Sequence, residues 1–131
     1  MARILLVEDD SAVRAFVERA LQLDGHDVET ASDGGLGLEL LEETLAAGDA
    51  YDLLLSDIQM PIMDGIGLAL TAAQKDPNMP ILLMTGYAEQ RERATNLSRV
   101  IVDVVAKPFT LPDIRKAVAE ALATGGSGSD G

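Results

Sequence analysis

The sequence predicts an α/β domain in which helices cover both faces of a five-stranded parallel sheet. Short apolar runs alternate along the chain with amphipathic stretches of helical length, which is the pattern of successive βαβ units. Apolar residues make up 47% of the 131 residues, enough for a core of ordinary size. No internal repeat divides the chain, so a single domain is expected.

Apart from 27–31, the predicted strands are apolar runs rich in Leu, Ile and Val. Each is too short for a helix, and such continuous apolar runs are typical of strands buried on both faces. Pro80 opens the fourth run, a position at which a strand tolerates proline. The predicted strands are 3–7, 27–31, 52–56, 80–84 and 101–106.

The predicted helices lie between and after these strands. In each of them leucines or alanines recur at spacings of three and four residues, which places them on one face of a helix. Asp10 or Ser11 can cap the first helix, and Gly25 and Gly48 follow the ends of the first and second. The predicted helices are 11–23, 35–47, 65–75, 87–97 and 111–123.

The order of the strands follows from the handedness of their connections. Right-handed crossovers wind the helices onto both faces of the sheet, and the flavodoxin-like order 2-1-3-4-5 is one of the common solutions. We expect this doubly wound domain to occupy residues 1–123. Residues 124–131 are rich in Gly and Ser and cannot bury apolar area, so they are expected to form a flexible tail.

The charge balance disfavours two classes of partner. The chain has 22 acidic and 10 basic residues and a formal net charge of −12, which repels nucleic-acid phosphates and anionic lipid headgroups. No apolar run approaches the roughly 18 residues of a membrane span, and no signal-peptide pattern opens the chain. The absence of cysteine fits a reducing compartment, so a cytoplasmic protein is expected.

Reactive side chains follow four of the predicted strands. Glu8 and Asp9 follow the first, Asp57 the third, Thr85 the fourth and Lys107 the fifth. Ligands bind at the carboxyl ends of the strands in open parallel sheets, so these groups would meet in one crevice. Solvated loop acids and a surface lysine would explain any one of these residues, but not the agreement of four strand ends.

A crevice of this composition predicts a site for Mg²⁺ and a phosphoryl group. Converging carboxylates repel one another unless a cation neutralises them, and Mg²⁺ suits a site with few carboxylates and retained waters. The Lys107 ammonium and the Thr85 hydroxyl can bind phosphoryl oxygens.

Four segments of the chain resemble the receiver domain of two-component response regulators, the CheY-like family. The resemblance covers residues 2–123, and the run that begins at Asp57 is its most specific part. The four segments are Glu8-Asp9, Asp57-Ile58-Gln59-Met60-Pro61-Ile62-Met63-Asp64-Gly65, Met84-Thr85-Gly86 and Lys107-Pro108-Phe109.

The resemblance implies a role for each site residue. Asp57 would accept a phosphoryl group from a phosphohistidine of a histidine kinase or a phosphotransferase. Mg²⁺ would be bound directly by Asp9, through water by Glu8, and by the backbone carbonyl of Gln59. Lys107 would pair with the phosphoryl group, and the Lys107-Pro108 peptide bond would be cis. The protein would then be a signalling module that catalyses its own phosphorylation and dephosphorylation, and not an enzyme acting on other substrates.

The chain departs from the common receiver pattern at the switch residues, for which Thr85, Tyr87 and Val104 are the candidates. Many receivers carry an aromatic residue three positions before the lysine, where this chain has Val104. Tyr87 is therefore a candidate for the sensing aromatic residue. It is equally a candidate for shielding Asp57 from water, or for an ordinary exposed loop tyrosine.

Two other classes of function compete with a receiver. A phosphatase with an aspartate nucleophile would need a general acid two residues after Asp57, where the chain has Gln59. A structural metal-binding module, such as a Ca²⁺ protein, would not require Thr85 and Lys107, and the sequence contains no EF-hand loop. The receiver is the preferred interpretation.

Further segments are similar to the CpdR family of stand-alone receivers. These segments are Met1 to Asp10, Arg14-Ala15-Phe16, Gly25-His26 and Met84-Thr85-Gly86-Tyr87-Ala88. CpdR proteins are bacterial cell-cycle regulators whose unphosphorylated form primes the ClpXP protease for selected substrates. Because the receiver accounts for almost the whole chain, a separate protein is expected to read the signal. The resemblance implies the ClpX unfoldase as that partner, and a phosphorelay intermediate or a chemotaxis-type regulator are the alternatives.

Overall fold

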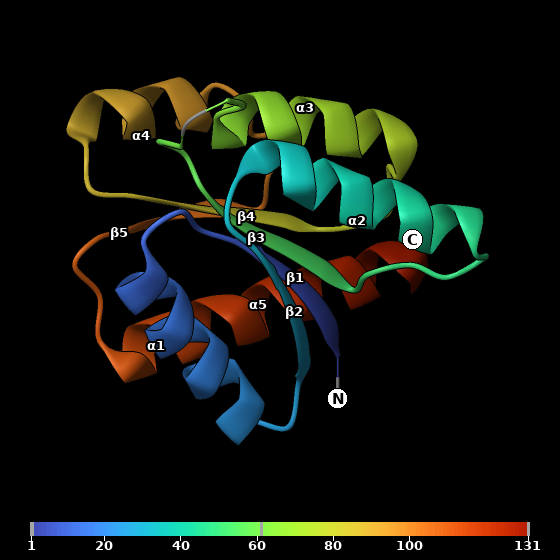
Figure 1. The fold of residues 1–131 in the computed structure, drawn as a ribbon, viewed down its shortest axis with the longest axis horizontal. Coiled ribbons are helices and arrows are strands. Elements are labelled where there is room, and N and C mark those ends of the chain that lie inside the picture. The colour runs from blue at the N-terminus through green and yellow to red at the C-terminus, as the bar shows by residue number, and fades with distance from the viewer. Residues whose placement is uncertain (1, 61, 131) are drawn as a thin grey trace.

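A five-stranded parallel sheet lies between two layers of helices (Figure 1). The computed structural model describes residues 2–60 and 62–130. The strands are β1 (Arg3–Val7), β2 (Asp27–Ala31), β3 (Leu53–Asp57), β4 (Ile81–Thr85) and β5 (Asp103–Ala106). Their order is β2-β1-β3-β4-β5 and every neighbouring pair is parallel, which confirms the predicted order.

Helices cover both faces of the sheet, as expected. They are α1 (Ser11–Leu23), α2 (Gly34–Ala46), α3 (Gly65–Lys75), α4 (Ala88–Thr95) and α5 (Leu111–Asp130). Figure 1 shows α1 and α5 on one face and α2, α3 and α4 on the other. Within the described part of the chain, no helix is both long enough and apolar enough to cross a bilayer.

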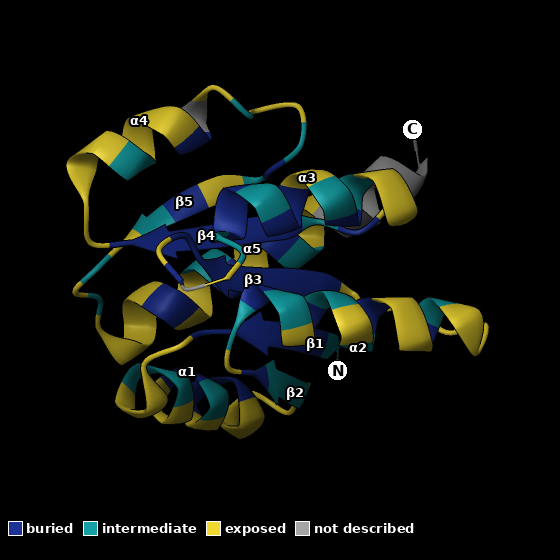
Figure 2. Ribbon diagram, turned by 45° about the horizontal axis from the view of Figure 1, so that its top comes forward, coloured by how far each residue is buried: buried dark blue, intermediate teal, exposed yellow. Residues whose placement is uncertain are grey.

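The apolar core is divided into two clusters by the sheet. Successive residues of a strand point to opposite faces, so Leu5 and Val7 join the cluster under α2 and α3. Ile4 and Leu6 join the cluster under α1 and α5. The central strand β3 is buried along its whole length (Figure 2). Its buried faces hold the strand ends, and hence the residues that follow them, in fixed positions.

Aspartate caps explain where three of the helices begin. Asp10 accepts hydrogen bonds from the Ala12 and Val13 amides, and Asp33 and Asp64 cap α2 and α3 in the same way. Each cap satisfies first-turn N–H groups that have no partner within the helix. The prediction of Asp10 as a cap is confirmed.

The strand and helix boundaries differ from the predicted ones by small shifts, with two larger exceptions. β5 begins at Asp103 and not at 101, because the Ile101 amide donates to the Leu97 carbonyl in a turn at 2.9 Å. The α5 helix runs to Asp130, so its predicted end at residue 123 is wrong. Extending a formed helix costs far less free energy than nucleating one. A prediction from the Gly and Ser content of the last residues does not take this into account. The division into a domain at 1–123 and a separate tail at 124–131 stays a prediction.

Gly65, the first residue of α3, lets this helix lie directly against the end of β3. A Cβ atom at this position would stand 2.1 Å from the Asp57 carbonyl oxygen and 2.9 Å from the Ile58 Cα. The Gly65 amide also donates to the Ile58 carbonyl at 2.7 Å. A residue without a side chain is therefore required here, and the contact fixes the backbone of Asp57.

We predict that Gly65→Ala lowers the free energy of unfolding by about 1–3 kcal/mol, because the new methyl group collides with backbone that cannot rotate away. Gly67→Ala is the matched control in the same helix turn. Its Cβ would meet its nearest atoms at 3.5 Å, so this variant should gain about 0.5–1 kcal/mol from helix propensity. Urea denaturation of both variants is the measurement. Equal stability of the two would contradict the close-contact argument.

Candidate functional site

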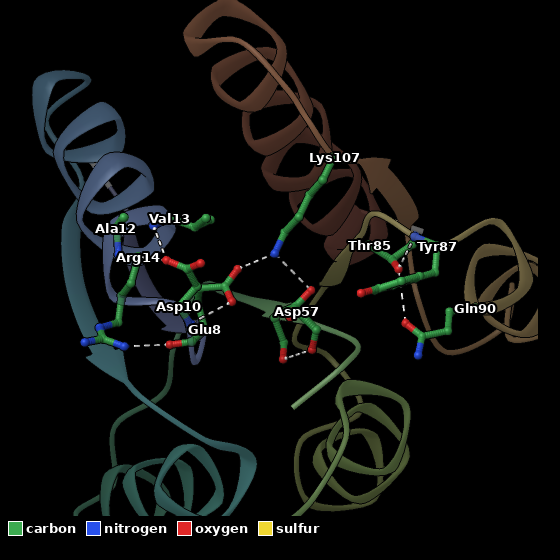
Figure 3. Close-up of polar contacts among 11 residues, drawn as sticks. Glu8, Asp10, Ala12, Val13, Arg14, Asp57, Thr85, Tyr87, Gln90 and Lys107 are labelled. Carbon is green, nitrogen blue, oxygen red and sulfur yellow. Dashed lines mark hydrogen bonds and ion pairs between the residues drawn. The ribbon is translucent and has the colours of Figure 1, made fainter. Parts of the chain in front are cut away.

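Side chains at or just after the carboxyl ends of β1, β3, β4 and β5 come together at one edge of the sheet (Figure 3). The strand register brings them together. Val7 pairs with Ser56, so the residues that follow them, Glu8 and Asp57, lie side by side. Thr85 pairs with Ala106, which places Lys107 just beyond the end of β4. The hollow at this edge is lined by Glu8, Asp9, Asp10, Ala12, Val13, Phe16, Asp57, Gln59, Gly86, Tyr87, Lys107, Pro108 and Phe109.

Lys107 bridges two buried carboxylates. Its Nζ atom donates to Glu8 Oε1 at 2.6 Å and lies 3.2 Å from Asp57 Oδ1 (Figure 3). Glu8 is completely buried, and its second oxygen accepts from the Asp10 amide at 3.2 Å. Asp57 is 6% exposed. One ammonium group thus links the ends of β1 and β3 to the end of β5.

Burial dominates the electrostatics of this cluster. Burial raises the pKa of Glu8 to about 7, and the nearby charge of Asp57 adds to the rise, while the hydrogen bond from Lys107 works against it. Burial also raises the pKa of Asp57, against the opposing charge of Lys107. For Lys107, burial lowers the pKa, but the hydrogen bond to Glu8 and the charge of Asp57 leave it above its usual value. When both Glu8 and Asp57 are ionised, the single positive charge of Lys107 does not neutralise them, and the site carries excess negative charge.

The carboxylates of Glu8, Asp9 and Asp57 can share one cation. One oxygen of each lies within 4.8 Å of the others. Asp9 is exposed while Glu8 and Asp57 are buried, so the cluster opens to solvent on the side of Asp9. Hard oxygen donors in small number fit Mg²⁺ with several retained waters. Gln59 lines the same hollow, and the role of its backbone carbonyl as a ligand stays a prediction.

Thr85 lies at the rim of the cluster with its hydroxyl already engaged. Its buried side chain accepts from the Tyr87 amide at 3.1 Å and donates to Gln90 Oε1 at 3.1 Å. The Gln90 amide reaches on to Gln59 Oε1 at 3.4 Å. Sequence reasoning missed Gln90, because nothing in an uncharged residue in the first turn of α4 indicates that it folds back onto Thr85.

The two other switch candidates occupy different places. Tyr87 is 55% exposed and lines the hollow, and its ring points back toward Asp57 (Figure 3). Val104 is buried in β5 opposite Leu83 and belongs to the core cluster on the α4 side, away from the carboxylates. Their roles as switch residues stay predictions.

Arg14 is a second contributor that the sequence did not assign to the site. Its Nη1 atom donates to the Glu8 carbonyl at 2.8 Å and so fixes the backbone next to the buried carboxylate (Figure 3). The Lys107-Pro108 peptide bond is cis, as the receiver resemblance implied. Pro61 of the motif that begins at Asp57 lies outside the described residues.

A family model described as "Response regulator receiver domain" matches residues 4–119. The chain belongs to the receiver domain family. The expected CheY-like fold and two-component class are thereby confirmed. Members of this family are signalling domains that bind Mg²⁺ at an acidic pocket, and this chain has an acidic group formed by Glu8, Asp9 and Asp57.

Several known proteins are similar to this chain in sequence or in fold. The response regulator receiver protein CpdR of Brucella abortus is 37% identical over 122 residues, which cover 93% of this chain and 98% of CpdR. The response regulator MprA of Mycobacterium ulcerans is 36% identical over 86% of this chain but only 46% of MprA. A CheY-like receiver domain protein from Methanospirillum hungatei superposes with a TM-score of 0.85 at 29% identity, covering 97% of this chain and 98% of that one. Chemotaxis protein CheY4 of Vibrio cholerae gives a TM-score of 0.79 at 27% identity, covering 92% of this chain and 98% of CheY4.

We predict that the site binds Mg²⁺ with a dissociation constant in the millimolar to sub-millimolar range, on the order expected for few carboxylates and retained waters. Asp9→Ala should abolish the binding, because it removes the exposed carboxylate of the cluster. Asp27→Ala, an equal loss of charge at the opposite end of the sheet, should leave it intact. Titration with Mg²⁺ followed by NMR is the measurement. Unchanged binding by the Asp9 variant would remove the site as drawn.

Proposed function

We propose that Asp57 accepts a phosphoryl group from a phosphohistidine of a histidine kinase or phosphotransferase in a Mg²⁺-dependent reaction, and that the product changes which protein the chain binds. The observation that carries this proposal is the Lys107 bridge. Asp57 is buried and shares the Lys107 ammonium group with Glu8, and in a chain of the receiver domain family this supports Asp57 as the phosphoryl acceptor.

The transfer is a displacement at phosphorus. A carboxylate oxygen of Asp57 forms a bond to phosphorus while the nitrogen–phosphorus bond of the phosphohistidine breaks. The imidazole leaves with the electron pair. It departs as neutral imidazole if its other ring nitrogen is already protonated, and otherwise it takes a proton from water. Bound Mg²⁺ supplies charge neutralisation and orientation for the phosphoryl oxygens. Lys107 stays protonated, since its raised pKa favours the ammonium form, and can turn from Glu8 toward the new oxygens.

The neighbours of Asp57 support a signalling role over a phosphatase. Gln59, two residues after Asp57, lines the same hollow, but its amide cannot deliver a proton as a general acid. An acyl phosphate formed here would persist until water attacks phosphorus and the Asp57 carboxylate leaves, with Lys107 beside the phosphoryl oxygens. The chemistry therefore acts on the protein itself and changes its surface.

We predict that a small phosphodonor or a cognate kinase labels Asp57 with an acid-stable, base-labile phosphoryl group. Asp57→Asn should not take the label, because an amide oxygen is a far weaker nucleophile than a carboxylate. Asp27→Asn is the matched control and should label at the wild-type level. Mass spectrometry after labelling, with and without Mg²⁺, locates the group. Label on another residue of the wild-type protein would overturn the assignment of Asp57.

Lys107→Ala separates the chemistry from the switch. This variant should still bind Mg²⁺, since Lys107 is not among the carboxylates of the cluster. It should fail to change its partner binding after phosphorylation, because the ion pair between the phosphoryl group and the last strand is lost. A wild-type response of partner binding in this variant would show that Lys107 does not couple the site to the surface.

The similarity to CpdR supports a particular output. We propose that the unphosphorylated protein binds an unfoldase of the ClpX type and directs selected substrates to ClpXP, and that phosphorylation weakens this complex. The helix α4 and the last helix α5, with Tyr87 and Val104 reporting the state of the site, are the proposed contact surface. The 37% identity extends over 98% of the Brucella abortus protein, so the two chains match in extent as well as in sequence.

We predict that Asp57→Ala behaves as a constitutively active form in this output. A ten-fold loss of affinity on phosphorylation needs only about 1.4 kcal/mol of differential stabilisation, which one phosphoryl group and its hydrogen bonds can supply. The measurement is degradation of candidate substrates by purified ClpXP with the wild type, Asp57→Ala and phosphorylated protein. If none of the three changes the rate across several substrates, a phosphorelay or motor-type role replaces the protease role.

A further inference from the structure

The Thr85 hydroxyl has one proton, and that proton points away from the acidic cluster. The hydroxyl donates it to Gln90 Oε1 at 3.1 Å and uses a lone pair to accept from the Tyr87 amide at 3.1 Å. Thr85 is 3% exposed, so no bulk water competes for this hydrogen bond. Figure 3 shows Gln90 beside Thr85, on the side of α4.

A hydroxyl cannot donate to two acceptors at full strength. While Gln90 holds the proton, Thr85 cannot donate to a phosphoryl oxygen on Asp57. The Gln90 side chain also donates from Nε2 to Gln59 Oε1 at 3.4 Å, so it connects the segments that follow β3 and β4. One amide side chain thereby ties α4 to both segments beside Asp57.

The helix that carries Gln90 is lightly held. α4 has eight residues, a length at which an isolated helix is marginal. Its N-cap residue Tyr87 makes no side-chain capping hydrogen bond. Among the side chains of residues 88–94 of α4, Ala94 is the one that is fully buried, and the Arg93–Asp64 ion pair at 3.8 Å joins two well-exposed groups. The hydrogen bonds of Gln90 therefore help to fix the start of α4.

We propose that Gln90 is a positioning residue that holds Thr85 in the unphosphorylated arrangement, so that phosphorylation must exchange the acceptor of the Thr85 hydroxyl and release the first turn of α4. The inference rests on the proposed phosphorylation of Asp57 and adds the residue that opposes it. Gln90 acts through Thr85 and does not touch the reacting atoms. A change of the Gln90 side chain that weakens the Thr85–Gln90 hydrogen bond shifts the two-state equilibrium toward the arrangement of the phosphorylated form.

The test measures the affinity of the full chain for beryllofluoride, a mimic of the acyl phosphate, in the presence of Mg²⁺. Gln90→Met, which keeps the size of the side chain but removes its amide, should bind beryllofluoride about threefold to tenfold more tightly than the wild type. Gln90→Glu retains an acceptor for the Thr85 proton. This variant should bind beryllofluoride no more tightly than the wild type does. Gln74→Met, the same substitution at an exposed position of α3, is the control for Gln90→Met and should not change the affinity. Arg91→Gln, with the same change of charge as Gln90→Glu, shows how much of that effect is electrostatic.

A double-mutant cycle separates this role from a merely structural one. In a Thr85→Val background the hydroxyl is absent, so Gln90→Met should produce no further gain. An equal gain in that background, or unchanged affinity of Gln90→Met in the wild-type background, would overturn the inference. Normal labelling of Asp57 in either case would leave the proposed function standing. Failure of the wild-type protein to label at all would instead remove the proposed function, and this inference with it.

Discussion

The ammonium group of Lys107 is the interaction on which the rest of the site depends. Glu8 and Asp57 lie side by side because β1 and β3 are neighbours, and both are buried. Two carboxylates in that position would raise each other's cost of ionisation, and burial alone already raises both pKa values. Lys107 offsets part of this cost with one short hydrogen bond and one ion pair. A lone buried charge costs more than a pair, so the three groups depend on one another.

The Lys107 bridge depends on the arrangement of the strands in the sheet. Lys107 and Glu8 are 99 residues apart in the chain, and the contact forms only after β5 is in place. To reach Glu8, the lysine side chain crosses the end of β4, where Thr85 pairs with Ala106. Gly65 at the start of α3 packs against the end of β3, because its missing side chain leaves room for the Asp57 carbonyl. Charge placement and backbone packing therefore constrain the same few atoms.

Much of this arrangement could be predicted because it follows from periodicity and strand ends. Apolar runs separated by helical stretches predict a doubly wound parallel sheet, for which the order 2-1-3-4-5 is one of the common solutions. The cluster of Glu8, Asp57 and Lys107 follows because parallel strands end at one edge of the sheet. The helix caps follow from the chemistry of aspartate at a helix start. None of these inferences depends on the exact path of a loop.

The features that sequence reasoning missed depend on such paths. Gln90 reaches Thr85 only because the turn after β4 directs the first turn of α4 back over the strand end, and no residue pattern specifies that direction. The start of β5 depends on a turn hydrogen bond at Ile101, in a run whose apolar character alone resembles a strand. The end of α5 depends on propagation of a formed helix into residues of low helix propensity.

The burial of Glu8 and Asp57 has a consequence for how the protein responds to its surroundings. The formal charge of −12 lies largely on exposed side chains, where dissolved salt screens it over roughly 8–10 Å. The Lys107 bridge is largely buried, and mobile ions screen it less. Ionic strength therefore acts on how often charged partners encounter the surface, through long-range attraction and repulsion. It has little influence on the balance of charge around Asp57 once a partner has docked, so encounter and chemistry are tuned by separate parts of the molecule.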